Sequence, residues 1–168
     1  MKNLELDLEK IHLISQQKEQ ENFRFRSFLK GQDSKRIDSI VHRLNKEIGD
    51  QIDCTTCGNC CSILTTNVTK KEIDVLAEYE NISPQDFEAN FLKKVQYEPT
   101  LCLKDMPCRY LKDKKCTIYS FRPDDCRSYP NLHKKDFNSR TLFVLEQYGI
   151  CPIVFNVFER LKLEFRFR

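Results

Sequence analysis

Glycine is scarce in this sequence, with four residues in 168. Neither G-x-G-x-x-G nor G-x-x-x-x-G-K-[ST], the glycine-rich loops that bind phosphate groups, occurs in it. Nucleotide-dependent chemistry built on those two loops is therefore excluded. The sequence also lacks H-E-x-x-H and a nucleophile elbow, so it carries neither of these metalloprotease and hydrolase motifs.

Long uncharged runs are absent as well. No stretch approaches the roughly 20 apolar residues that a membrane-spanning helix needs. The first ten residues, MKNLELDLEK, carry acidic side chains where a signal peptide would have an apolar core. We therefore expect a cytoplasmic protein that does not bind membranes.

Cysteine is too infrequent for a disulfide scaffold. The nine cysteines in 168 residues fall below the roughly 8–10% that is typical of small secreted disulfide proteins, and their number is odd. A reducing compartment favours thiolate chemistry over disulfides. Spacing alone still leaves open a disulfide between some of the later cysteines.

The formal net charge of +3 is unevenly distributed, because the basic excess lies in residues 101–168. A basic segment of this kind is typical of a nucleic-acid contact, or of a region that neutralises a bound anionic group. The pI of about 8.3 is below the value above 9 that is usual for nucleic-acid-binding domains. Four thiolates around Zn²⁺ leave a charge of about −2, so we favour neutralisation of a thiolate centre over nucleic-acid binding.

A chain of 168 residues and 20.0 kDa fits one ordinary domain. In one segment, apolar residues recur at i, i+3, i+4, i+7 and i+11, which predicts an amphipathic helix that ends near Gly49. This apolar stripe consists of Ile37, Ile40, Val41, Leu44 and Ile48. Residues 1–34 carry apolar positions without a sustained period, and we expect them to be helical but weakly specified.

Two helices are indicated by their N-terminal residues. Thr69 and Glu72 have the spacing of a capping box, in which each side chain binds the other residue's backbone N–H. Ser83 and Pro84 place a cap directly before a proline at the first helical position. We expect both helices to serve packing.

Two more helices are expected towards the C-terminus. Asn138 or Ser139 can cap a helix over residues 140–148, and Gly149 would end it in the left-handed conformation. Apolar residues from Val154 to Leu161 then recur with helical spacing.

Residues 97–136 differ from the rest, because four prolines interrupt any regular period. We read this stretch as loops with one short helix beginning at Pro123. The sequence therefore predicts a mainly α, small single domain of about five to six helices framing an irregular, loop-rich cysteine centre. Its expected parts are an N-terminal helical region (1–49), a cysteine domain (50–155), and a C-terminal helix end and tail (156–168).

Four of the cysteines lie within eight residues, at Cys54, Cys57, Cys60 and Cys61. C-x2-C is the shortest spacing that lets two thiolates of one tight turn converge on an ion, so we interpret the run as metal-ligating. Gly58 would permit a positive φ that turns backbone N–H groups toward the sulfurs. Adjacent side chains point in different directions, so we do not expect Cys60 and Cys61 to serve one ion in the same way.

The other five cysteines contain no second C-x2-C. They are Cys102, Cys108, Cys116, Cys126 and Cys151. Zinc ribbons and fingers normally have two such pairs, so the simplest zinc module is disfavoured. The opening C-x2-C-x2-C instead matches the first three ligands of a bacterial ferredoxin, and a cysteine-proline pair at 151–152 resembles the end of such a run.

Five ordered motifs carry a resemblance to a known family. They are C-T-T-C-G-N-C-C at 54–61, P-C-R-Y-L at 107–111, K-C-T-I-Y at 115–119, R-P-D-D-C-R-S-Y-P at 122–130 and C-P at 151–152. Together they resemble the YkgJ-type cysteine-cluster family, also described as a zinc- or iron-chelating C-x2-C-x2-C-C domain, over roughly residues 50–155. The resemblance implies metal chelation and a distant relation to flagellin lysine N-methylases, which contain a similar cysteine domain.

The resemblance also implies a set of metal ligands. These are Cys54, Cys57, Cys60, Cys61, Cys108, Cys116, Cys126 and Cys151. Cys102 is an additional cysteine outside the set. Eight thiols allow two four-thiolate sites, or one cluster together with structural or resolving cysteines.

Charged and polar residues near the later cysteines are candidate modulators. Arg122 and Arg127 flank Cys126, where guanidinium groups could donate to sulfur and offset thiolate charge. The alternative is that both bind Asp124, Asp125 or helix-end carbonyls. His133 follows Cys126 by seven residues and is a candidate ligand or proton relay.

Three functions follow as hypotheses. The first is a metal-binding protein with a cysteine-ligated iron–sulfur cluster or Zn²⁺ centre, acting in redox chemistry, sensing or metal handling. The second is an enzyme of methyltransferase-like or oxidoreductase type that uses the centre. The third is a zinc-stabilised module that binds a protein or nucleic acid. The sequence identifies no substrate and no protein partner.

Overall fold

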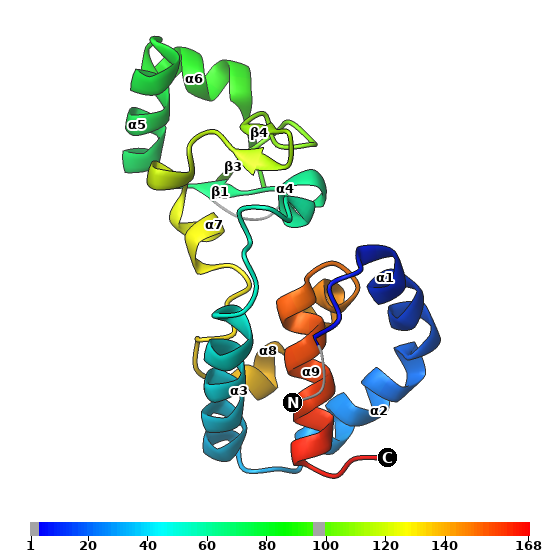
Figure 1. The fold of residues 1–168 in the computed structure, drawn as a ribbon. Coiled ribbons are helices and arrows are strands. Elements are labelled where there is room, and N and C mark those ends of the chain that lie inside the picture. The colour runs from blue at the N-terminus through cyan, green and yellow to red at the C-terminus, as the bar shows by residue number, and fades with distance from the viewer. Residues whose placement is uncertain (1–3, 96–99) are drawn as a thin grey trace. The chain divides into compact units, whose positions relative to one another are not determined.

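The computed structural model describes residues 4–95 and 100–168 and is mainly helical, which confirms the predicted fold class (Figure 1). The chain divides into two compact units, which are described separately. Unit 1 consists of Met1–Asp53 and Pro130–Arg168, and unit 2 consists of Cys54–Tyr129. Within the described ranges, no helix is long and apolar enough to cross a membrane.

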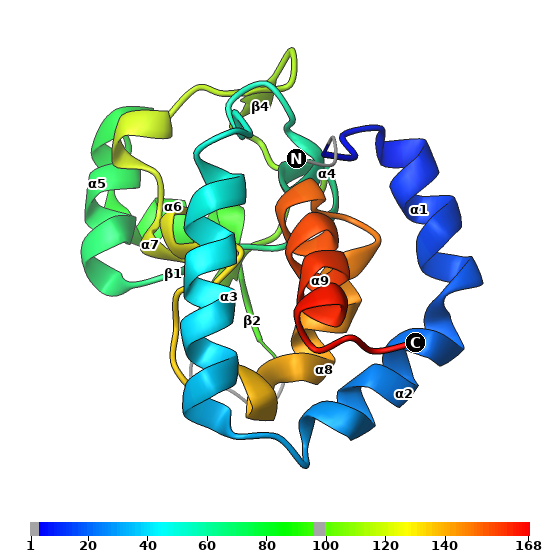
Figure 2. The same cartoon turned by 60° about the horizontal axis from the view of Figure 1, so that its bottom comes forward.

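Unit 1 is an all-helical unit in which α9 is central. Its helices are α1 (Leu8–Gln17), α2 (Glu19–Leu29), α3 (Ser34–Gly49), α8 (Phe137–Tyr148) and α9 (Pro152–Glu164). Helix α9 packs against α1, α3 and α8, and α3, α8 and α9 lie side by side in Figure 2. Every residue from Pro152 to Phe158 is buried, which explains why this helix is apolar on nearly all sides.

Helix α3 forms as its apolar stripe predicts. Asp33 caps it by accepting a hydrogen bond from the Arg36 backbone N–H at 2.6 Å, and the helix ends at Gly49. Ile37, Val41 and Ile48 are fully buried. Burial of such side chains contributes about 1.5–3 kcal/mol each.

Helix α8 begins three residues earlier than the sequence indicates, and neither Asn138 nor Ser139 caps it. Its N-cap is Asp136, which has a left-handed φ of 57°. The backbone N–H groups of Asp136 and Phe137 donate to the carboxylate of Asp38, each at 2.9 Å. A side chain 98 residues away in sequence thus replaces a local cap, and local sequence rules do not detect it.

Gly149 ends α8 without the predicted left-handed conformation, since its φ is −84°. The reason for glycine here is space. A Cβ atom at this position would lie 2.5 Å from Ser15 Oγ. Close approach of α1 therefore excludes a side chain at Gly149.

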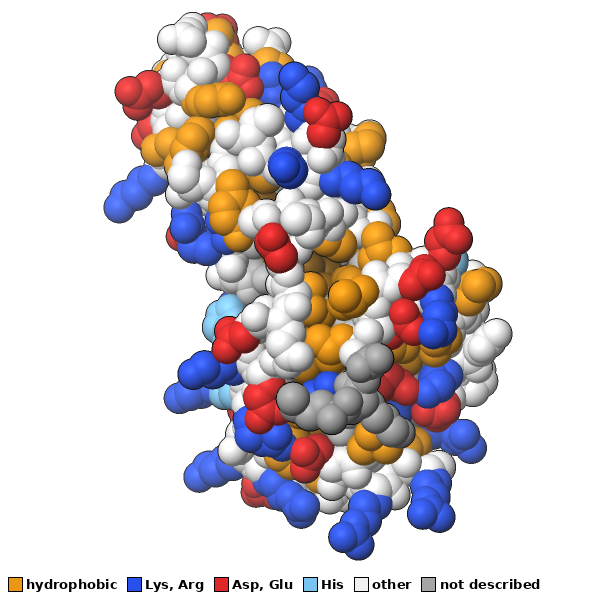
Figure 3. Space-filling view, in the orientation of Figure 1, with side chains coloured by type: hydrophobic (Ala, Val, Ile, Leu, Met, Phe, Trp, Pro, Cys, Tyr) orange, Lys and Arg blue, Asp and Glu red, His pale blue; other side chains and the backbone are white. Residues whose placement is uncertain are grey.

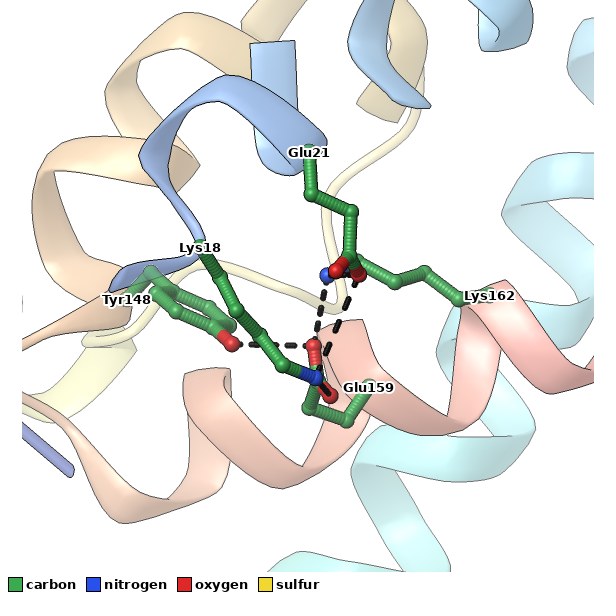
Figure 4. A network of polar contacts seen from close by, with 5 residues as sticks. All are labelled: Lys18, Glu21, Tyr148, Glu159 and Lys162. Carbon is green, nitrogen blue, oxygen red and sulfur yellow. Dashed lines mark hydrogen bonds and ion pairs between the residues drawn. The ribbon is translucent and has the colours of Figure 1, made fainter. Parts of the chain in front are cut away.

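A polar network is enclosed between α1, α2, α8 and α9 (Figure 4). The Lys162 side chain is only 5% exposed and donates to Glu21 and Glu159, each at 2.6 Å. Tyr148 donates its hydroxyl to Glu159 at 2.9 Å, and Lys18 pairs with the same carboxylate. Burial alone would raise the pKa of Glu159, but the hydrogen bonds from Lys162 and Lys18 outweigh it and lower that pKa.

Unit 2 combines short helices with two small antiparallel sheets. Its helices are α4 (Asn59–Ile63), α5 (Lys70–Glu80), α6 (Pro84–Phe91), the 3-10 helix η1 (Tyr119–Phe121) and α7 (Asp124–Ser128). Its strands are β1 (Asn67–Val68), β2 (Leu92–Lys94), β3 (Leu101–Leu103), β4 (Leu111–Lys112) and β5 (Lys115–Cys116). The predicted capping box of Thr69 and Glu72 starts α5, and Ser83 with Pro84 starts α6.

The prediction that 97–136 contains only loops and one short helix was incomplete. Strand β3 pairs with both β1 and β2, so that Cys102 faces Asn67 on one side and Lys93 on the other. A second sheet is the β4–β5 hairpin. Strands of two or three residues are too short to show an alternating pattern, so sequence periodicity does not detect them. The predicted helix after Pro123 is confirmed as α7.

The hairpin turn lies against the first cysteine turn. Asp113 and Lys114 form the turn with positive φ angles of 49° and 62°. Gly58 also has a positive φ, 63°, as its position predicted. A Cβ atom on Gly58 would lie 2.9 Å from the Lys114 carbonyl oxygen. Glycine is therefore required at this position for both its conformation and its size.

We predict that Gly58→Ala destabilises unit 2 by about 2 kcal/mol. The left-handed conformation is unfavourable for a residue with a Cβ, and the added atom would also displace the hairpin backbone. Urea unfolding of the full chain measures this change. Gly49→Ala is the matched control, since a Cβ there meets no atom within 4 Å, and alanine should stabilise the end of α3 slightly. Equal effects of the two substitutions would contradict the prediction.

We predict that Glu159→Gln lowers the free energy of unfolding by about 1.5–3 kcal/mol at pH 7, as expected for loss of hydrogen bonds to a charged group. Because the pKa of Glu159 is lowered in the folded state, the stabilisation is complete above the unfolded-state pKa of about 4.3. It disappears as the pH falls through the lower folded-state pKa. Unfolding curves between pH 7 and pH 3 should therefore show the wild type and the variant converging.

The exposed Glu146 on α8 provides the control, as Glu146→Gln. This variant should keep the pH dependence of the wild type. A constant difference between wild type and Glu159→Gln down to pH 3 would show that the charge of Glu159 does not stabilise the fold.

Candidate metal centre

The run of cysteines at 54–61 forms a turn followed by the short helix α4. Cys57 donates its backbone N–H to the Cys54 carbonyl at 3.4 Å, and Gly58 then starts α4. The sulfurs of Cys60 and Cys61 lie 3.9 Å apart. The expectation that these two side chains diverge is therefore wrong. Sulfurs bound to one tetrahedral Zn²⁺ at 2.3 Å are separated by about 3.8 Å, so both thiols fit one ion.

Main-chain contacts join this turn to the segment that carries Cys108 and Cys116. The Cys108 backbone N–H donates to the Cys61 carbonyl at 2.8 Å. The Leu111 N–H in turn donates to the Cys108 carbonyl at 2.8 Å, and Leu111 faces Cys116 in the β4–β5 hairpin. Three cysteines distant in sequence are thus linked through two backbone hydrogen bonds and one strand pair.

Cys126 lies on α7 and joins the group from another direction. Its sulfur lies 3.1 Å from the hydroxyl oxygen of Thr66. The neighbouring Asp125 carboxylate accepts a hydrogen bond from the Asn67 backbone N–H at 3.0 Å. Thr66 and Asn67 follow the end of α4 by three and four residues, so this contact places α7 beside β1.

The four thiols of Cys61, Cys108, Cys116 and Cys126 interact electrostatically. Burial is the main cause that raises the pKa of Cys108, Cys116 and Cys126, the last to about 11. Negative charge on Cys61 raises all three further. A negative charge on Cys61 therefore favours the protonated form of each of the other three thiols.

Cys61 differs from the other three. A hydrogen bond from the Cys60 thiol lowers the pKa of Cys61 to about 7, although burial acts in the opposite direction. Its own backbone N–H and the positive charge of Arg122 contribute to the lowering. Cys61 is thus the thiol of this group that ionises most readily near neutral pH.

The two arginines take different roles. Arg122 donates to the Tyr119 carbonyl at 2.6 Å and stacks 3.7 Å above the Tyr119 ring. Its charge lowers the pKa of Cys61 and opposes the rise at Cys116, so the charge offset expected at Cys126 acts on these two thiols, while its hydrogen bond goes to a helix carbonyl. Arg127 instead pairs with Asp124 at 3.3 Å and donates to the Arg122 carbonyl at 3.2 Å, which is the alternative drawn from the sequence.

The remaining candidates lie elsewhere. Cys102 is buried in β3, between β1 and β2. Cys151 and His133 belong to unit 1, where Cys151 is buried before α9 and His133 is exposed. The reduced thiols include Cys57, Cys61, Cys102, Cys108, Cys116 and Cys126.

The structure places the segments of these four thiols next to one another, but it does not form a complete set of ligands around a metal ion. Among the described residues, no three His, Cys, Asp or Glu side chains are gathered closely enough to hold a metal ion. Ligation would therefore require the four thiols to move closer together. Thr66 and Glu72 are the site residues that sequence reasoning missed: Glu72 was assigned only to its capping box, yet it also accepts the Asp124 backbone N–H at 2.6 Å.

Comparison with known proteins places these cysteines in a family. No solved structure matches the chain. A family model described as "CxxCxxCC: Putative zinc- or iron-chelating domain" matches residues 53–143. That match covers more than half of the chain and includes seven of the eight predicted ligands, while Cys151 lies beyond it. The chain therefore belongs to the CxxCxxCC family of zinc- or iron-chelating domains.

Proposed function

We propose that unit 2 binds a metal through the thiolates of Cys61, Cys108, Cys116 and Cys126. One observation carries this proposal: main-chain contacts join segments that are separate in the sequence, since the Cys108 N–H donates to the Cys61 carbonyl at 2.8 Å and Cys116 faces Leu111 in the adjoining hairpin. Thiols gathered in this way can release their protons together when a divalent cation offsets the repulsion between the resulting thiolates.

The chemistry of the donor set fits the metals of this family. Thiolate sulfur is a preferred ligand of zinc and of iron–sulfur clusters. Four thiolates around a divalent ion would leave a charge of about −2, and Arg122 supplies positive charge beside Cys61 and Cys116. When bound, the metal would supply either a structural crosslink or, as an iron–sulfur cluster, one-electron redox chemistry.

The other predicted ligands extend the centre. Cys54, Cys57 and Cys60 occupy the same turn as Cys61, and the Cys60 sulfur lies 3.9 Å from that of Cys61. Unit 2 thus holds seven of the eight cysteines of the family pattern, more than a single four-thiolate site uses. This number of thiols exceeds what one structural zinc ion requires.

We favour iron over zinc for the centre, and a role in redox chemistry or metal handling in the cytoplasm. The support is the C-x2-C-x2-C spacing of Cys54, Cys57 and Cys60, which share a turn with Cys61 and match the opening of a ferredoxin run. Nucleic-acid binding has less support, because Lys and Arg side chains are interspersed with Asp and Glu over the face shown in Figure 3.

We predict that the full chain, purified without oxygen, contains iron and acid-labile sulfide in comparable amounts and absorbs visible light. Elemental analysis, a sulfide assay and an absorption spectrum measure these quantities. Zinc without sulfide, in a colourless protein, would replace the iron assignment and keep the thiolate centre. A protein that retains no metal, and takes up neither zinc nor iron with sulfide on reconstitution, would overturn the proposed function.

We predict that Cys61→Ser and Cys116→Ser each reduce metal content at least several-fold, because a hydroxyl replaces a thiolate ligand. Cys102→Ser is the matched control: Cys102 is buried in β3 and is not among the proposed ligands. Metal content per folded chain, measured beside far-UV circular dichroism, distinguishes loss of a ligand from loss of folding. Equal metal content in all three variants would remove Cys61 and Cys116 from the ligand set.

A further inference from the structure

We propose that Thr66 is a positioning residue of the centre, whose hydroxyl donates a hydrogen bond to the Cys126 sulfur and orients it as a metal-bound thiolate. The inference rests on the metal centre proposed above. The Oγ1 and Sγ atoms lie 3.1 Å apart, a close contact for a hydrogen bond to sulfur. Thr66 itself lies outside the cysteine pattern of the family.

The chemistry fixes the direction of this hydrogen bond once a metal is bound. A ligating thiolate carries no proton, so Cys126 can then only accept. The Thr66 hydroxyl rotates freely and can donate. The same contact in the thiol form can run either way, which makes the hydroxyl an adaptable partner for both forms of Cys126.

Backbone pairing with the three-stranded sheet holds Thr66, the hydrogen-bond donor, in place. The Thr66 carbonyl accepts a hydrogen bond from the Leu103 backbone N–H at 2.9 Å, and the next residue, Asn67, pairs with Cys102 in the β1–β3 ladder. Thr66 is partly buried, whereas its neighbour Thr65 is exposed. The position of the hydroxyl is therefore set by backbone pairing with β3, through the Thr66 carbonyl and through the next residue.

Two carboxylates hold helix α7, which carries the accepting Cys126 sulfur, in place. Asp125, adjacent to Cys126, accepts the Asn67 backbone N–H at 3.0 Å. Glu72 accepts the backbone N–H of Asp124 at 2.6 Å, and its other oxygen accepts the Thr69 backbone N–H in the α5 capping box, also at 2.6 Å. These contacts tie α7 to β1 and to the start of α5.

The consequence is that Thr66 and Cys126 meet because the framework brings them together. A hydrogen bond to a thiolate lowers the energy of the sulfur lone pairs and holds the sulfur in one orientation. Outer-sphere partners of this kind typically contribute about 10–100-fold to metal affinity. Thr66 would therefore affect both the strength and the electronic character of metal binding at Cys126.

The test titrates the metal-free full chain with Co²⁺, whose bonds to thiolate give a charge-transfer band in the near ultraviolet. Thr66→Val keeps the side-chain shape and removes the hydroxyl. We expect it to bind Co²⁺ about 10-fold more weakly and to shift the band to longer wavelength, because the sulfur lone pairs rise in energy. Thr66→Ser, which keeps a hydroxyl, should restore both values.

Two further variants separate the hydroxyl from general packing. Thr66→Ala removes the same hydroxyl without a branched side chain, and it should shift the band in the same direction even if Thr66→Val folds poorly. Thr65→Val, at the exposed neighbour, should leave affinity and band unchanged.

The outcomes distinguish this inference from the proposed function. A wild-type thiolate–cobalt band that stays in place in Thr66→Val and Thr66→Ala would overturn the role of Thr66 and leave the metal centre intact. Weaker binding with an unmoved band would likewise show that Thr66 acts only through packing. No thiolate–cobalt band in the wild-type protein would overturn the role of Thr66, whereas the proposed centre is overturned only if zinc and iron with sulfide are not taken up either.

Discussion

The proposed centre depends on one main-chain hydrogen bond and on the close contact beside it. The Cys108 N–H donates to the Cys61 carbonyl, while Gly58 lies against the backbone of Lys114. Both contacts join the cysteine turn to the β4–β5 region through backbone atoms. The relative placement of Cys61, Cys108 and Cys116 is therefore set by the backbone and does not depend on side-chain rotamers. A metal would bind thiolates whose segments already adjoin.

Burial and charge act against each other among these thiols. Desolvation raises the pKa of Cys108, Cys116 and Cys126, whereas the Cys60 hydrogen bond and Arg122 make Cys61 easier to ionise. Near neutral pH the cluster thus holds one readily ionised sulfur among three that keep their protons. Metal binding would have to release those protons, so affinity for metal is linked to pH through the buried thiols.

Sequence reasoning succeeded where the cause of a structure is local. The stripe on α3, the capping box of Thr69 and the positive φ of Gly58 all depend on residues within a few positions of one another. It failed where the cause is distant, as when Asp38 caps α8. The short strands also escaped prediction, because two or three residues show no period.

The same distinction applies to the candidate site. Spacing identified Cys54, Cys57, Cys60 and Cys61, since closely spaced thiols are informative by themselves. The resemblance to the family added Cys108, Cys116 and Cys126, and the family match includes all seven. No sequence signal pointed to Thr66. Its contact with Cys126 spans 60 positions, and threonine is a common residue next to a strand. Partners that orient ligands are recognised only after the fold brings them together.

The division of the chain into units has a consequence for biosynthesis. Unit 2 is one uninterrupted segment, whereas unit 1 joins residues before Cys54 to residues after Tyr129. A ribosome therefore completes the cysteine-bearing segment while helices α8 and α9 are still unmade. Loading of an ion during translation would precede assembly of the helical unit, whose two parts must then meet across the inserted segment.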